Sequence, residues 1–166
     1  MEGESTSRLN GGQLARLLAI GSGEARERHH AWEPKAAARL REMLDSPFAA
    51  TDSARHRTGR DAPTTLEGVL HRRGTDLALL KEIKDRNKGT VTTAASDATR
   101  AAATAVYYAA IAAALVFHGE KITRHSDARL LEGFERLQDA TWIPSDLRTL
   151  IAKGRAVCAG RLADHS

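Results

Sequence analysis

Basic side chains are the residues of this sequence whose number and spacing point most directly to chemistry. The candidate contacts for a nucleic acid are Arg55, Arg57, Arg60, Arg72, Arg73, Lys84 and Lys88. Cations gathered on one face would neutralise phosphates, with an affinity that falls with salt. No aromatic residue stands among them in the sequence to stack on a base, which argues against sequence-specific recognition of single strands. A solvated surface explains the same residues equally well.

Histidines are the next candidates, because imidazole is both a base and a metal ligand. His29 and His30 lack further ligands at a spacing diagnostic of zinc, so we interpret them as solvated residues of a polar connector. His118 and His125 flank a turn that also holds Glu120. The trio could gather around a cation, or His118 could cap the carboxyl end of the preceding helix, where a positive charge favours the dipole. We favour the cap.

Tyrosine and cysteine also have structural explanations. Tyr107 and Tyr108 lie within an alanine-rich segment, where a phenol usually bonds to a backbone carbonyl or a polar partner. Cys158 falls on an apolar stripe, which is typical of an inert buried thiol. The sequence has no phosphate-binding glycine loop, nucleophile elbow or zinc-protease motif. It therefore predicts no catalytic, cofactor-binding or metal-binding residue and leans away from an enzyme.

The totals are those of one globular domain. The chain has 166 residues, a net charge of +4 and a hydrophobic content of 42%, which is long and apolar enough to bury a core. A single cysteine fits a reducing compartment, and no secretion signal is apparent at the N-terminus. We therefore expect a cytoplasmic protein.

The longest uncharged stretch, residues 101–117, predicts the architecture. It is mostly alanine, the best helix former, and it is apolar on every side. Such a helix must be surrounded by protein or by lipid. Because it reaches only the lower limit for a membrane span and charged residues crowd both of its ends, we expect a core helix and no membrane span. The prediction is an all-α fold, a helical bundle around a central helix at about 97–118.

Shorter apolar periodicities place the other helices. The expected helices cover residues 12–20, about 34–45, 66–73, 76–88, 127–138 and 146–163. The expected N-caps are Thr64, in a capping box with Glu67, then Thr75, Ser96 and Ser126. Gly89 and Gly119 are expected to end their helices, and Gly154 is expected to mark a close approach between two helices.

Three segments follow from these helices. Residues 1–45 are predicted to form a small N-terminal helical pair, 46–63 a flexible basic loop, and 64–163 the main helical bundle. The loop is longer than most connections in compact domains, which indicates either a function or disorder.

Two resemblances accompany these motifs. The run YYAAIAAALV, followed by a leucine-rich helix and a Trp-containing turn, resembles an uncharacterised bacterial all-helical family, and this implies the fold only. The tyrosine-containing helix followed by His125-Ser126 has a looser similarity to HEPN domains, helical bundles of which many are ribonucleases. Those enzymes use an Arg and a His separated by four to six residues, whereas Arg161 and His165 are separated by three.

The function expected from the sequence is that of a non-enzymatic protein-interaction module, an adaptor or regulatory subunit with a protein partner and no cofactor. The alternative is a nucleic-acid-binding domain or a degenerate HEPN-like domain related to ribonucleases. The absence of a catalytic motif favours the first hypothesis, and the basic residues favour the second.

Overall fold

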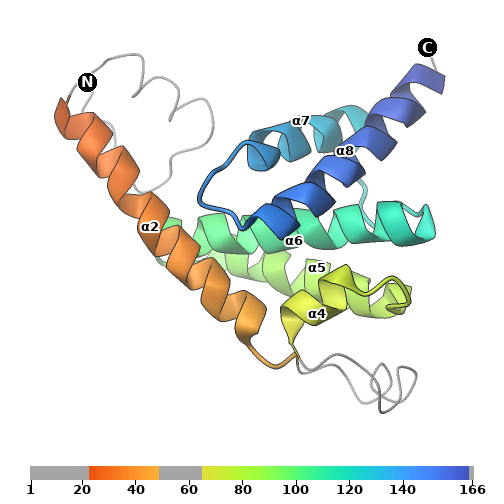
Figure 1. Ribbon diagram of the computed structural model, residues 1–166, viewed down its shortest axis with the longest axis horizontal. Coiled ribbons are helices and arrows are strands. Elements are labelled where there is room, and N and C mark those ends of the chain that lie inside the picture. Colours follow the sequence, from red (N-terminus) through yellow and green to blue (C-terminus); the bar gives the residue numbers. More distant parts are fainter. Residues whose placement is uncertain (1–22, 49–64, 165–166) are drawn as a thin grey trace.

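The computed structural model describes residues 23–48 and 65–164, and most of this part of the chain is helical. The helices are α2 (Gly23–Asp45), α4 (Leu66–His71), α5 (Leu77–Thr93), α6 (Asp97–His118), α7 (Asp127–Gln138) and α8 (Ser145–Asp164) (Figure 1). No strand occurs in these residues. The prediction of an all-α bundle is confirmed.

The alanine-rich helix α6 is the centre of the bundle, as predicted. Its side chains from Ala109 to Leu115 are all buried, so neighbouring helices enclose it. Ser96 caps its start by accepting a hydrogen bond from the backbone N–H of Thr99 at 3.1 Å. Gly119 ends it with a φ of 67°, a left-handed conformation that glycine adopts without steric cost. Both predicted ends of the helix are confirmed.

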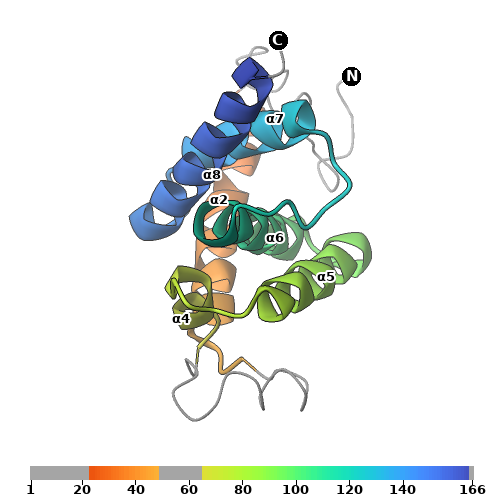
Figure 2. The ribbon, with the colours of Figure 1, turned by 90° about the vertical axis from the view of Figure 1, so that its right-hand side faces the viewer.

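The other helices lie on two sides of α6. Both ribbon views place α7 and α8 on one side of α6 and α4 and α5 on the other, while α2 crosses the bundle at an angle (Figures 1 and 2). Glycine allows α8 to lie directly on α6, because a Cβ built on Gly154 would come within 2.7 Å of the Ala112 Cβ. The close approach predicted at Gly154 is confirmed. In the same way, Gly133 of α7 accommodates the ring of Tyr108.

Helix α2 corrects one expectation. We predicted a polar connector through His29 and His30 and a helix that starts at Pro34, but α2 begins at Gly23 and holds Pro34 in its interior. Proline suits a first helical turn, yet it also occurs inside a helix at the cost of one backbone hydrogen bond. The apolar periodicity of the sequence starts only after Pro34, because the buried side chains described in α2, Ala36 among them, all follow this residue.

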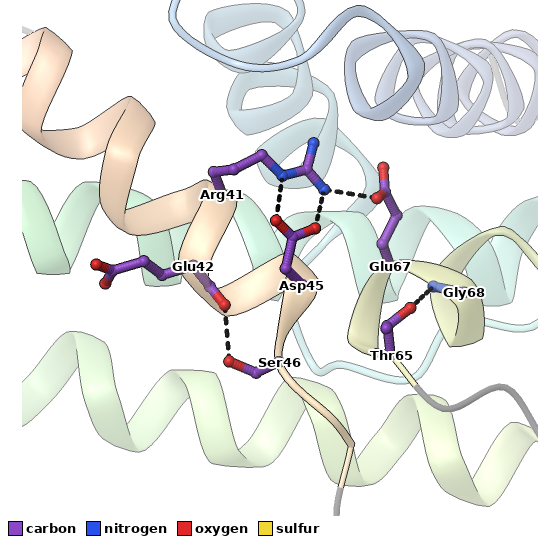
Figure 3. Close-up of polar contacts among 7 residues, drawn as sticks. All are labelled: Arg41, Glu42, Asp45, Ser46, Thr65, Glu67 and Gly68. Atoms are coloured by element: carbon purple, nitrogen blue, oxygen red, sulfur yellow. Dashed lines mark hydrogen bonds and ion pairs between the residues drawn. The ribbon is translucent and has the colours of Figure 1, made fainter.

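The end of α2 meets the start of α4 (Figure 3). Arg41 binds Asp45 on its own helix at 2.9 Å and reaches Glu67 of α4 at 2.5 Å. The backbone N–H of Leu66 donates to the carbonyl of Ser46 at 3.1 Å. The predicted basic loop at 46–63 lies mostly outside the described residues, but the two segments that flank it are bonded to each other.

The N-cap of α4 differs from the prediction by one residue. Thr65, and not Thr64, accepts from the backbone N–H of Gly68 at 3.1 Å (Figure 3). The proposed capping box is wrong, because Glu67 binds Arg41 instead.

Helix α5 also starts and ends later than predicted. Its N-cap is Asp76, whereas the hydroxyl of Thr75 donates to the carbonyl of Val69 at 2.8 Å. The helix continues through Gly89 to Thr93, since glycine ends a helix only where the backbone takes a positive φ, and among the described residues Gly119 alone does so. The segment after Gly89, expected to be a loop, therefore extends α5 by a turn.

The predicted division into a helical pair and a main bundle stays a prediction. Residues 12–20, the first helix of the pair, lie outside the described residues. The second helix, α2, buries Leu40 and Leu44 in the same core as α6.

One described helix, α6, is long and apolar enough to cross a membrane by length and composition, and most of it is buried inside the bundle. This burial is compatible with a soluble protein.

Candidate functional site

A basic pocket lies between α5 and the connection from α6 to α7, which passes above α5 in the view of Figure 2. Its volume is about 430 Å³, which falls within the usual range for small-ligand sites. The residues that line it are Lys81, Lys84, Lys88, Tyr107, Lys121, Ile122, Thr123, Arg124 and His125. No Asp or Glu is among them, so the pocket is suited to an anion.

The spacing of lysines on α5 forms one wall of the pocket. Lys81, Lys84 and Lys88 follow one another at intervals of three and four residues, which places them on the same face of a helix. Arg86 points elsewhere: it pairs with Glu82 and lies over the ring of Phe48.

The second wall of the pocket is the connection between α6 and α7, and Lys84 joins it to α5. Its ammonium group donates to the backbone carbonyl of Ile122 at 2.6 Å and lies 3.1 Å from a carboxylate oxygen of Asp85. Because Ile122 is buried, this contact fixes the connection against α5. Lys84 is therefore chiefly a structural residue of the pocket.

The remaining cations differ in how far they are neutralised. Lys121 lies 3.6 Å from an oxygen of Asp127. Lys81, Lys88 and Arg124 have no carboxylate within 4.0 Å among the described residues. Three positive charges around one pocket without a nearby anion repel one another, and a bound anion would relieve that repulsion.

A tyrosine–histidine pair lies at the inner side of the pocket. The hydroxyl of Tyr107 and Nε2 of His125 are 3.0 Å apart. Burial lowers the pKa of His125 below its ordinary value of 6.5, and the charges of Arg129, Lys88 and Lys84 lower it further. The ring is therefore neutral at pH 7, with one N–H group.

In either tautomer this pair keeps one hydrogen-bond donor for a ligand. If the Tyr107 hydroxyl donates to Nε2, the imidazole carries its proton on Nδ1. If Nε2 donates instead, the phenolic O–H keeps its proton for another acceptor. Tyr107 is only 8% exposed, so it offers its polar edge and not a stacking face.

The structure places the predicted nucleic-acid contacts in different regions. Lys84 and Lys88 line the pocket. Arg72 and Arg73 follow α4 and do not line it. Arg55, Arg57 and Arg60 lie outside the described residues.

Sequence reasoning missed the other half of the pocket. The connection contributes Lys121, Arg124 and His125, none of which was among the predicted contacts. An aromatic residue from elsewhere in the sequence, Tyr107 of α6, also lines the pocket. The helical spacing of Lys81, Lys84 and Lys88 could have predicted the wall that α5 forms. Nothing local in the sequence shows that residues 121–125 fold back on α5.

The remaining candidates have structural partners. His118 lies in the last turn of α6, as expected for a residue that favours the dipole at this end, and its Nε2 also bonds to the carbonyl of Thr75 before α5 at 2.7 Å. Cys158 is fully buried, and this burial raises the pKa of its thiol. Arg161 donates to the carbonyl of Gly119 at 2.8 Å, and His165 lies outside the described residues. Within the described ranges, no group of three or more His, Cys, Asp or Glu is placed to hold a metal.

Comparison of the chain with protein-family models, with curated proteins and with solved structures finds no significant match. The chemistry of the pocket is therefore the basis for a function.

Proposed function

We propose that this protein binds nucleic acid through the basic pocket between α5 and residues 121–125. The observation that supports the proposal is the convergence of Lys81, Lys88 and Arg124 on a pocket whose lining has no acidic residue, with no carboxylate of the described residues within 4.0 Å of these three cations.

Two physical arguments support phosphate as the recognised group. Lysine and arginine are the usual partners of phosphate oxygens, and their bonds to it are charge-assisted. The aromatic content of the pocket is limited to a nearly buried tyrosine edge and a histidine, so recognition depends on charge rather than on base stacking. Binding with little preference for sequence is the expected behaviour.

The protein-interaction module that the sequence favoured remains the competing hypothesis. An acidic protein segment would also be attracted to these cations, but a nucleic acid repeats its phosphates at every nucleotide and so offers them a denser series of charges. We therefore place nucleic acid first.

The test is the affinity of the full-length protein for single-stranded RNA and DNA oligonucleotides over a range of salt concentrations. If the strand places three to five of its phosphates against the protein's cations, the slope of log affinity against log salt should be about −2 to −3.5, at about 0.7 per phosphate on a single strand. If neither nucleic acid binds at low salt, the proposal is wrong and an acidic protein partner becomes the better hypothesis.

A further inference from the structure

The basic pocket has more donors than a phosphate within a strand requires. Lys81 and Lys88 contribute two cations from α5, Arg124 contributes a third from the connection, and the Tyr107–His125 pair supplies a neutral donor. A phosphodiester has a single negative charge and two non-bridging oxygens. A phosphate monoester has a charge of about −1.5 to −2 at neutral pH and three acceptor oxygens.

We propose that the pocket binds a terminal phosphate monoester, either on a free nucleotide or at the end of a nucleic-acid strand. This inference rests on the proposed function, because it names the part of the nucleic acid that enters the pocket.

A group with three acceptor oxygens can accept hydrogen bonds from donors that lie on separate elements. The lysines belong to α5, Arg124 to the connection, and Tyr107 to α6, so donors approach from three elements. Lys84 holds two of these elements together through Ile122, so the two backbones that present these donors are already joined before a ligand binds. Lys81, Lys88 and Arg124 are exposed, and a ligand would order their side chains around it.

The pocket has room for an organic group beside the phosphate. A volume of about 430 Å³ lies in the range of pockets that hold small organic ligands. Ile122 and the edge of Tyr107 supply apolar surface beside the cations, which is suited to the sugar that joins a terminal phosphate to its base.

The experiment compares oligonucleotides of one sequence that differ only at their ends: a 5′-phosphate, a 3′-phosphate, or two hydroxyl ends. The strands with a terminal phosphate should bind about tenfold or more tightly, since an additional charge-assisted contact changes affinity by about that factor. A mononucleotide should compete with them. Inorganic phosphate should compete more weakly, because it leaves the apolar part of the pocket empty.

Variants assign this preference to the pocket. Lys81→Gln and Tyr107→Phe should reduce the ratio between phosphorylated and hydroxyl-ended strands several-fold. Lys153→Gln, a matched change at an exposed lysine of α8 that does not line the pocket, should leave the ratio unchanged. Circular dichroism of each variant distinguishes loss of the preference from loss of the fold.

The outcomes separate this inference from the proposed function. Equal affinity for all three strands, with no competition by the mononucleotide, would overturn the terminal-phosphate inference and leave nucleic-acid binding standing. Binding of the mononucleotide without binding of any strand would support the pocket's ligand chemistry and reject nucleic acid as its source. Absence of binding to every probe would reject both.

Discussion

Nε2 of His125 lies 3.0 Å from the hydroxyl oxygen of Tyr107, although the two residues are 18 positions apart in the sequence. The bond joins the central helix to the connection before α7, beside a group of cations. It brings the largely buried phenol of the alanine helix, for which we expected a structural partner, to the basic pocket.

The stability of the protein should depend on the protonation of His125. Burial lowers the pKa of this group in the folded state, whereas the unfolded chain has a pKa near the ordinary value of about 6.5. Below that pH the unfolded state binds the proton more readily, so the free energy of unfolding falls as the pH drops toward the folded pKa.

Denaturant midpoints between about pH 7 and pH 5 test this dependence. The comparison is between the unmodified protein and His125→Gln, because the other histidines contribute equally to both. The variant should lose less stability on acidification. Identical pH dependence in the two proteins would show that His125 does not titrate differently on folding.

A glycine pair in α8 tests the contact with the central helix. Gly154→Ala places a Cβ within 2.7 Å of Cβ and 3.0 Å of Cα of Ala112, so α8 must move away from α6 at a cost of about 1–3 kcal/mol. The matched change Gly160→Ala meets no atom within 4 Å and should stabilise the protein by about 0.5–1 kcal/mol through helix propensity.

The free energy of unfolding of both glycine variants, measured with heat or denaturant, tests this prediction. Opposite signs are expected from the same chemical change in the same helix. If both variants gain stability, α8 does not lie on α6 at Gly154.

The thiol of Cys158 should resist modification in the native protein. It is fully buried, and burial raises its pKa, so little thiolate is available to react. A disulfide-exchange reagent should label it much more slowly in buffer than in denaturant. Equally fast labelling in both would contradict the packing of α8 against the core.

The predictable part of the fold is the part that local chemistry determines. The central helix could be bounded from Ser96 and Gly119 because a hydroxyl cap and a left-handed glycine act on adjacent residues. Gly89 shows the limit of that reasoning, since the same residue type inside α5 takes a helical backbone. Pro34 was misjudged for a similar reason: its position within a helix depends on residues that precede it.

The candidate site was predictable only in part. The face formed by Lys84 and Lys88 follows from helical spacing, but its completion by Arg124 depends on a tertiary contact. That contact is made by Lys84 with the backbone carbonyl of Ile122, and a backbone acceptor leaves no signature in the sequence. A pocket whose residues come from separate segments therefore cannot be predicted from local sequence patterns.

The central claim is that nucleic acid binds at the basic pocket and not at any exposed basic residue of the surface. The most direct measurement is the affinity of Lys88→Glu and Lys153→Glu for one single-stranded oligonucleotide at low salt, with folding checked by circular dichroism. The two variants have the same net charge, but only Lys88 lines the pocket. The account predicts that Lys88→Glu loses about tenfold or more in affinity and reduces the salt slope by about 0.7 or more, while Lys153→Glu changes little. Equal losses in the two variants, or no loss in Lys88→Glu, would contradict it.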